Sequence, residues 1–176
     1  MAASKSEAGE GGRGSALDPI ARLEAIEEIK LLKSRYFQAV DFKDWHGIVD
    51  IFTDDARVDF SGEPQHHVGH HGVTEDSIDP DSWVVVGGPE TAKVIAGAVG
   101  EIVAVHQGHD PQIHAHSQDY ATGRWSLYDR LEYGNEVMHG FGHYQEEYRR
   151  IDGKWRISSL TLTRIKVVWE VLGRAG

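Results

Sequence analysis

The C-terminal part of the chain consists of four long strand patterns separated by short turn signals. These patterns cover residues 106–116, 120–131, 137–150 and 155–169. Asp152-Gly153, between the last two, is a strong hairpin signal because Asp-Gly suits a tight turn with positive φ. Four successive antiparallel strands predict one strongly bent sheet, which needs helices on its concave side to cover an apolar face.

The N-terminal part predicts the helices that would cover this sheet. Asp18 is placed to cap a helix, and Pro19 suits its first turn. From Ile20 to Val40, apolar residues recur every three or four positions, which predicts one long amphipathic helix. Further patterns predict a short helix, a strand and a helix lying across the sheet, at residues 45–52, 56–60 and 89–103. The predicted fold class is α+β, a cone-shaped curved sheet with helices on its concave side around a pocket.

A single domain accounts for this pattern. The chain has 176 residues, and 40% of them are hydrophobic, which is enough for one sizeable core. Residues 1–15 are rich in Gly, Ala, Ser and Glu and offer almost nothing apolar to bury, so we expect a flexible tail there. The domain itself is expected to cover residues 16–176.

Composition excludes several kinds of partner and chemistry. The formal net charge of -10, with 18 basic and 28 acidic residues, argues against nucleic acid as a partner. The chain has no Cys, which excludes disulfides, thiolate nucleophiles and Cys-based metal sites. It has no apolar run long enough to span a bilayer and no signal-peptide pattern at its start, so we expect a cytoplasmic protein without membrane association.

Two polar residues stand out against apolar surroundings. Asp41 directly follows Ala39 and Val40, where the long helix turns its buried side inward, and His106 opens a strand after an apolar run. An imidazole is the side chain best suited to accept a proton near neutral pH, and a neighbouring carboxylate fixes its tautomer. The residues alone leave a second interpretation open, in which the histidine is buried against a backbone carbonyl and the aspartate caps its own turn.

Several segments resemble one known family in their order along the chain. They are residues 36–60, 105–109, 121–125, 142–150 and 153–157. The chain resembles the SnoaL-like branch of the nuclear-transport-factor-2-like superfamily, which includes scytalone dehydratase, hexachlorocyclohexane dehydrochlorinase and bile-acid 7α-dehydratase. The resemblance spans roughly residues 17–169 and implies the same α+β cone. It also implies that Asp41 and His106 form the family's catalytic pair.

The resemblance also bears on residues near this pair. Tyr36 lies five residues before Asp41, where the bile-acid dehydratase has a catalytic tyrosine, although an aromatic residue at this helical spacing is as often part of a core. Val40 and Phe60 stand where scytalone dehydratase carries tyrosines, so we do not expect its water-bridged mechanism here.

We expect aromatic and polar side chains from several segments to line the substrate pocket. The predicted pocket residues are Phe60, Trp83, Trp125, His143 and Arg164. Strand alternation does not decide which face of residues 137–150 points inward, so an outer-face position or an oligomer contact stays open for His143.

Residues 61–82 have neither a helical nor a strand period, which predicts a loop acting as a lid. This loop contains four histidines between His66 and His71. Histidines three or four residues apart can share a metal ion on a helix, but Gly69 and Gly72 argue against a helix here. We therefore expect a polar, mobile lid and no metal site.

These features predict an acid–base enzyme that needs no cofactor and removes a proton from carbon of a small, largely apolar, cyclic substrate. A dehydratase-like lyase is the first choice and an isomerase or polyketide cyclase-like enzyme the next, because all three need the same base. The alternatives are a non-catalytic ligand-binding or structural subunit and a protein-binding adaptor, since one fold hosts many functions. We also expect a homotrimer or homodimer formed through the outer face of the long strands.

Overall fold

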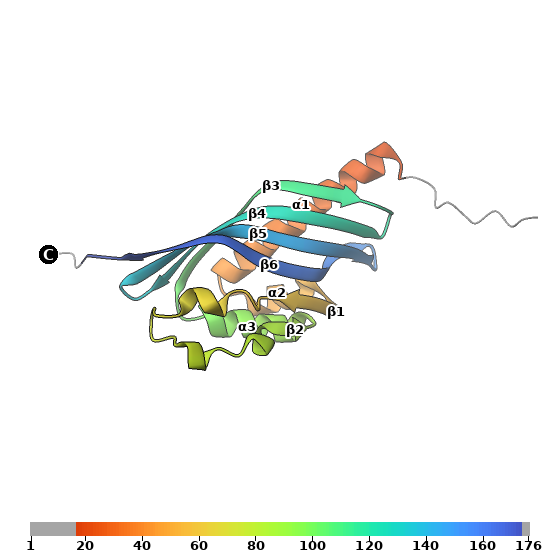
Figure 1. Cartoon of the computed structure of the whole chain (residues 1–176). Coiled ribbons are helices and arrows are strands. Elements are labelled where there is room, and N and C mark those ends of the chain that lie inside the picture. The colour runs from red at the N-terminus through yellow and green to blue at the C-terminus, as the bar shows by residue number, and fades with distance from the viewer. Residues whose placement is uncertain (1–16, 174–176) are drawn as a thin grey trace, which may run out of the picture.

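The computed structural model describes residues 17–173, so the predicted tail at residues 1–15 lies outside the described part. Within these residues, three α-helices and six strands follow one another (Figure 1). Their bounds are α1 Pro19–Asp41, α2 Trp45–Ile51, β1 Phe52–Asp59, β2 Val84–Val86, α3 Gly88–Val99, β3 Val103–Ala115, β4 Tyr120–Tyr133, β5 Glu136–Ile151 and β6 Lys154–Val171.

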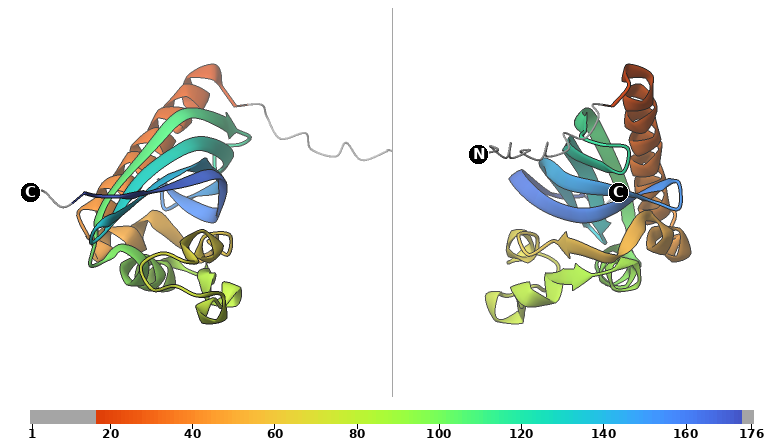
Figure 2. Two further views of the ribbon diagram at one scale, coloured as in Figure 1. Left: turned by 60° about the vertical axis from the view of Figure 1, so that its left-hand side comes forward. Right: turned by 90° about the vertical axis from the view of Figure 1, so that its right-hand side faces the viewer.

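All six strands belong to one sheet with the order β2-β1-β6-β5-β4-β3. Neighbouring strands are antiparallel except β1 and β6, which run parallel. Figure 2 shows the long strands β3 to β6 curving together, with α1 running along them and α2, α3 and the β1–β2 connection gathered at one end. This arrangement confirms the predicted α+β fold with a strongly curved sheet.

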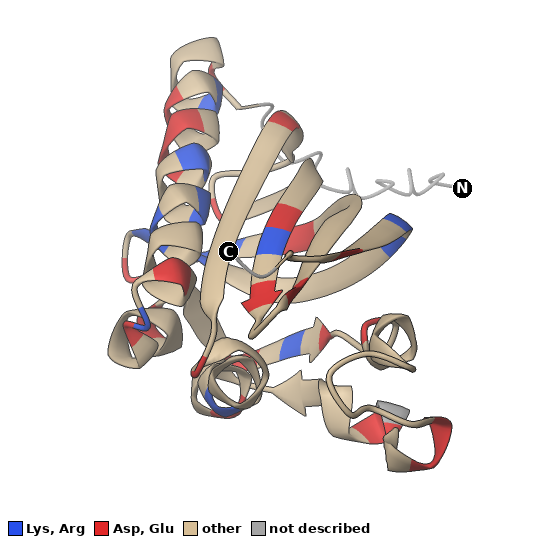
Figure 3. Cartoon of the chain, turned by 90° about the vertical axis from the view of Figure 1, so that its left-hand side faces the viewer, with Lys and Arg blue, Asp and Glu red and all other residues tan. Residues whose placement is uncertain are grey.

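The long helix α1 has the predicted start and the predicted buried side. The Asp18 side chain accepts a hydrogen bond from the Ala21 backbone N–H at 3.3 Å, and Pro19 is in the first turn. Charged residues recur along α1 (Figure 3), and all of them except Lys33 are exposed or half-buried. The inward side buries Ile29, Leu32 and Tyr36 together with Lys33. Among the described residues, no helix is long and apolar enough to cross a membrane.

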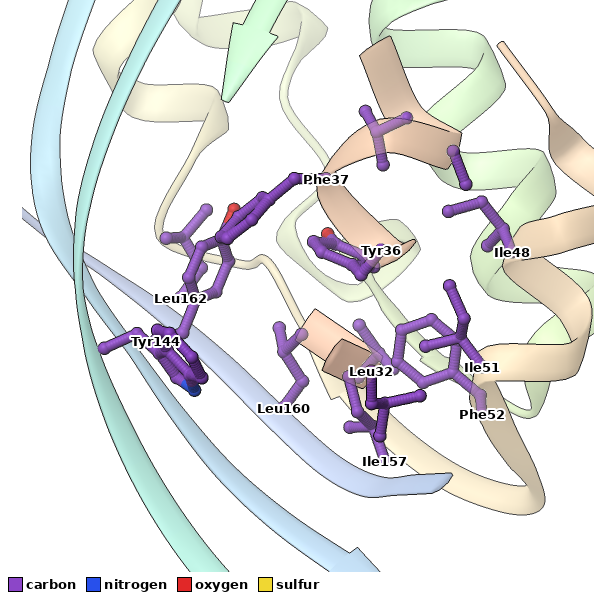
Figure 4. Packing of buried hydrophobic residues seen from close by; sticks show 14 of the residues in the cluster. Leu32, Tyr36, Phe37, Ile48, Ile51, Phe52, Tyr144, Ile157, Leu160 and Leu162 are labelled. Atoms are coloured by element: carbon purple, nitrogen blue, oxygen red, sulfur yellow. The ribbon is translucent and has the colours of Figure 1, made fainter. Parts of the chain in front are cut away.

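The core lies between the helices and the inner face of the sheet. Figure 4 shows Tyr36 and Phe37 of α1 near Tyr144 of β5, and Leu32 of α1 beside Ile157 of β6. Ile48 and Ile51 of α2 and Phe52 of β1 pack at the other side of Tyr36 in the same view. Tyr36 therefore belongs to the apolar cluster, as one of its two predicted interpretations required.

The third helix and the first strand differ from the predicted bounds. The helix expected at residues 89–103 ends at Val99, because Gly100 caps it and the chain then enters β3 at Val103. The strand expected at residues 56–60 already begins at Phe52, because it pairs with β6 from Phe52 onward. The expected loop at residues 61–82 contains short 3₁₀ helices at Pro64–His67, Glu75–Ser77 and Pro80–Trp83.

A bulge in β6 determines which of its residues point inward. Phe141 of β5 pairs with Lys166, but the next residue, Gly142, pairs with Arg164, so Ile165 is the extra residue. Alternation therefore restarts after Ile165, which is 71% exposed. As a result Arg164 and Trp169 both lie on the inner side of the sheet, although five positions separate them.

The outer face of the long strands is only partly apolar. Val105, Phe141 and Val168 are exposed there, next to exposed polar residues such as Gln145 and Glu147. The homotrimer or homodimer expected through this face stays a prediction.

Candidate functional site

A cavity of about 380 Å³ lies between the inner face of the sheet, the end of α1, α3 and the loop after β1. Its apolar wall includes Val40, Phe60, Trp83, Ile95, Leu131 and Leu162. Polar side chains also line it, among them Tyr36, His106, Asp129, Tyr144 and Arg164. A mostly apolar cavity with a few convergent polar groups is the usual form of a small-molecule site.

His106 and Asp41 form a close pair at one wall of the cavity. Nδ1 of His106 lies 2.7 Å from Oδ1 of Asp41. The backbone N–H of His106 donates to both carboxylate oxygens of Asp41, at 3.1 Å each. Asp41 is the last residue of α1 and His106 belongs to β3, so the pairing fixes the helix end to the sheet.

This geometry fixes the tautomer that a neutral His106 ring adopts. The Asp41 carboxylate can only accept hydrogen bonds, so Nδ1 of His106 donates and carries the proton of the neutral ring. Nε2 is then the nitrogen left to accept a proton, and the His106 ring lines the cavity. The pair can therefore act as a general base, with Asp41 orienting the ring.

Two phenols face the cavity beside this pair. Tyr36 of α1 and Tyr144 of β5 both line it, with ring centroids 6.1 Å apart. Burial first, and then the negative charge of Glu146, raise the pKa of Tyr36. Burial also raises the pKa of Tyr144. Both hydroxyl groups therefore stay protonated at neutral pH and can donate hydrogen bonds to an oxygen on which charge develops.

A buried ion pair lies behind these phenols. The side chains of Lys33 and Glu146 are fully buried and in contact. Nζ of Lys33 lies 3.5 Å from the Tyr144 ring centroid and 4.3 Å from that of Tyr36, which adds cation–π attraction. Burial lowers the pKa of Lys33 to about 8, although Glu146 opposes this shift. The Lys33 ammonium group therefore contacts both phenol rings while it is paired with Glu146.

Arg164 of β6 is held between two carboxylates at the inner face of the sheet. Its Nε and Nη2 donate to the carboxylate of Glu63 at 2.7 and 2.8 Å. Its Nη1 and Nη2 donate to the carboxylate of Asp129 at 3.0 and 2.7 Å. Burial alone would lower the pKa of Arg164, but Glu63 and Asp129 outweigh it and keep that pKa above its ordinary value.

The loop after β1 closes the cavity with histidines. Nδ1 of His67 lies 2.9 Å from Nε2 of His71, and the His71 ring stacks on Tyr133 of β4 with centroids 4.0 Å apart. His70 stacks on Trp169 of β6 at 4.1 Å. Within residues 17–173, no group of three or more His, Asp or Glu side chains is arranged to hold a metal ion.

The same loop is hydrogen-bonded to the sheet. Glu136 of β5 accepts from the His71 backbone N–H at 2.8 Å and lies 3.0 Å from Nδ1 of His70. Nε1 of Trp169 donates to the backbone carbonyl of His66 at 2.9 Å. The loop therefore has more buried contacts than its polar sequence predicts, and its motion as a lid stays a prediction.

The structure brings most of the predicted site residues together. Tyr36, His106, Phe60, Trp83 and Arg164 line the cavity, and Asp41 lies directly behind His106.

Two predicted pocket residues lie elsewhere. Trp125 is buried in the core, where its Nε1 donates to the Tyr148 hydroxyl at 2.9 Å, and the cavity does not reach it. His143 points to the outer face of the sheet, with Nε2 2.9 Å from Nη2 of Arg124. The reason is strand alternation: the next residue, Tyr144, is the one that points inward.

Several polar cavity residues were not predicted from the sequence, among them Glu63, Asp129 and Tyr144. A signal existed for Asp129, because Trp125, Leu127 and Leu131 alternate with outward residues and Asp129 is the one carboxylate in that inward row. In the β3–β4 register Asp129 also stands directly opposite His106. Glu63 had no such signal, since its segment has no period.

Solved structures share this fold at low sequence identity. A scytalone dehydratase-like protein from Novosphingobium aromaticivorans is 15% identical, with 88% of this chain and 95% of that chain covered and a TM-score of 0.66. A type 2 hexachlorocyclohexane dehydrochlorinase is 22% identical, with 90% and 99% covered and a TM-score of 0.67. The type 3 dehydrochlorinase from Novosphingobium barchaimii is 22% identical, with 87% and 94% covered and a TM-score of 0.65.

The sequence itself matches one family model over most of its length. The model describes a SnoaL-like domain and matches residues 21–161, which include both Asp41 and His106. This match confirms the resemblance inferred from the sequence motifs, and the chain belongs to the SnoaL-like family.

Proposed function

We propose that this chain is a dehydratase-like lyase that removes a proton from carbon of a small, largely apolar, cyclic substrate. The observation that carries the proposal is the His106 ring, which lines the cavity while its Nδ1 is held 2.7 Å from Asp41. The side chains of the cavity supply both a base and hydrogen-bond donors, so the proposed reaction uses no metal or organic cofactor.

The proposed step is loss of water from a hydroxyl group one carbon away from the acidic C–H bond. Nε2 of His106 accepts the proton from the carbon next to a substrate carbonyl, and Tyr36 donates a hydrogen bond to the oxygen that becomes negative. The electron pair then forms the new double bond and expels the hydroxyl group. The protonated His106 gives its proton to the departing hydroxyl, so water leaves and the base is restored.

One observation favours elimination over isomerisation or cyclisation. The names of the fold neighbours, a dehydratase-like protein and dehydrochlorinases, denote loss of water and loss of hydrogen chloride. One base that can take up and return a proton serves isomerisation as well as elimination, so the base alone does not separate these reactions. Asp41 would stabilise the imidazolium that exists between uptake and return of the proton.

Deuterium uptake tests proton removal without knowledge of the natural leaving group. A panel of cyclic β-hydroxyketones, starting with 3-hydroxycyclohexanone, is incubated with the protein in D₂O, and exchange at the α-carbon is followed by NMR. His106→Ala should lower the catalysed exchange rate by about 10²- to 10⁴-fold. Asp41→Asn should also lower it while ligand binding is retained, because the ring loses its charged partner more than its place.

The matched control is His109→Ala, which removes an exposed histidine from the same strand and should leave the exchange rate unchanged. If His106→Ala exchanges as fast as the unmodified protein, the proposed base is wrong. The non-catalytic ligand-binding alternative would then be the better interpretation.

A further inference from the structure

The guanidinium of Arg164 makes hydrogen bonds that leave little room for a ligand. Glu63 and Asp129 together accept four hydrogen bonds from it, between 2.7 and 3.0 Å. The side chains of all three residues are less than 10% exposed. An arginine at a cavity wall is the usual partner of a substrate carboxylate, but this one already has two carboxylate partners.

The three residues come from parts of the chain that only the folded structure brings together. Asp129 lies on β4 and Arg164 on β6, whereas Glu63 lies on the loop after β1. Gly140 of β5 leaves the necessary space, because a Cβ atom there would collide with Oδ1 of Asp129 and Nη1 of Arg164. The sheet therefore provides the Arg164–Asp129 pair, and the loop adds the second carboxylate.

We propose that Glu63 is a specificity-determining residue that excludes anionic substrates from the cavity. Its carboxylate occupies the Nε–Nη2 edge of Arg164, which is the edge that a bound substrate carboxylate would need. This inference rests on the proposed function only in taking the cavity as the place where substrate binds.

The charges around the cavity also disfavour an anionic ligand. Glu63 and Asp129 outnumber Arg164 within it, and Asp41 lies just behind His106. The segment from residue 58 to residue 92, which includes the loop, contains seven acidic residues and no Lys or Arg. An incoming anion would lose its hydration and meet like charges without gaining a new cationic partner.

An uncharged oxygen has suitable partners in the same space. The protonated hydroxyl groups of Tyr36 and Tyr144 can donate to a carbonyl, and apolar residues such as Phe60 and Leu162 can cover a ring. The cavity therefore fits a neutral cyclic ketone or alcohol, and Glu63 keeps otherwise similar carboxylates out.

Two ligands of nearly equal shape test this inference. 2-Acetylnaphthalene is neutral and 2-naphthoate is anionic, and they differ by a methyl group in place of one carboxylate oxygen. Isothermal titration calorimetry measures the affinity of each for the unmodified protein, for Glu63→Ala and for Glu63→Gln. Glu75→Gln is the matched control, because it removes one acidic charge from an exposed position on the same loop.

The unmodified protein should bind the ketone at least about tenfold more tightly than the carboxylate. Glu63→Ala should bind 2-naphthoate at least about tenfold more tightly than the unmodified protein does, since it frees one edge of Arg164. Glu63→Gln should also gain affinity for 2-naphthoate, but less than Glu63→Ala does. If Glu63→Ala does not fold, the affinity of Glu63→Gln tests the inference. Glu75→Gln should keep the preference of the unmodified protein.

Equal affinity of the unmodified protein for both ligands would overturn the inference. So would a failure of both Glu63 variants to gain affinity for 2-naphthoate, including the case in which neither ligand binds. Because binding is measured without turnover, a reversed preference in a protein that shows no deuterium exchange would refute the proposed catalysis and leave the role of Glu63 standing.

Discussion

The two walls of the cavity are held in place by different kinds of interaction. The wall with His106, Tyr36 and Tyr144 is built from α1 and the long strands. It is fixed by β-ladders and by the hydrogen bonds that the His106 backbone N–H donates to the Asp41 carboxylate. The wall at residues 61–83 is held to the sheet by side chains, chiefly Glu63 and a few histidines. The proposed chemistry thus lies on the wall that the backbone fixes, and the proposed selectivity lies on the other.

The largest expected effect is a loss of stability at the wall that carries His106, Tyr36 and Tyr144. Glu146→Gln leaves the buried Lys33 without its counter-charge, and breaking a buried ion pair costs about 3–5 kcal/mol of the free energy of unfolding. Urea denaturation measures the difference. Glu147→Gln, one residue along on the exposed outer face, should leave the unfolding curve nearly unchanged. Equal losses in the two variants would show that the pair does not support this wall.

A smaller loss of stability is expected at the wall formed by residues 61–83 when the pH falls. Burial, and then the positive charges of His71 and Arg164, lower the pKa of His67 from 6.5 to about 4. The opened loop therefore binds a proton more readily than the docked loop. The free energy that favours the docked loop should have its full value above about pH 6.5. It should decrease as pH falls toward about 4, by up to about 3 kcal/mol. Amide hydrogen exchange at residues 62–82 across this range measures the change.

The control for this titration is His67→Gln, which keeps a polar side chain but does not titrate in this range. Exchange in its loop should rise less steeply with acid than in the unmodified protein. An equal slope in the two proteins would show that groups other than His67 cause the response.

A weaker effect on the same wall is expected from Glu136→Gln. This change removes the negative charge of the carboxylate that accepts a hydrogen bond from the His71 backbone N–H and contacts the His70 ring. Both contacts are near solvent. Exchange of the loop amides at neutral pH should accelerate only a few fold, as expected for partly exposed pairs. The urea transition of the whole protein should not move. A shift in that transition would mean that the loop and the sheet unfold as one unit.

The smallest effect is expected outside both walls. His143→Ala truncates a side chain on the outer face, so stability should change by less than about 0.5 kcal/mol and α-proton exchange should not change. Tyr144→Phe, at the next position but facing the cavity, should lower the exchange rate because it removes a donor. A loss of activity in His143→Ala alone would contradict the assigned strand face.

The contrast between the walls also explains what the sequence predicts. The capped start of α1 and the Asp152-Gly153 turn, with φ of 51° and 76°, follow from local chemistry and were predicted. Asp41 and His106 were identified because each interrupts an apolar pattern. These features depend on short segments of sequence, for which periodicity and turn chemistry are informative.

The remaining parts of the site depend on packing between distant segments. Both faces of β5 carry large residues, so only contact with α1 decides that Tyr144 points inward. Arg164 meets Glu63 across 101 positions of sequence, and no period in the loop indicates that Glu63 is buried. Such contacts follow from the assembled sheet, and a single sequence carries no local sign of them.

The extra residue at Ile165 has a consequence for how this protein could change over evolution. Deleting that single codon would make the pairs Gly142–Arg164 and Phe141–Lys166 consecutive, so Val167 and Trp169 would keep their places on the inner side. Deleting the codon for Val167 instead would turn over the strand beyond it, and Trp169 would move to the outer side. His70 would then lose the ring on which it stacks. The strand therefore tolerates the loss of one residue at its bulge, whereas the same loss in the regular ladder releases a contact that holds the loop.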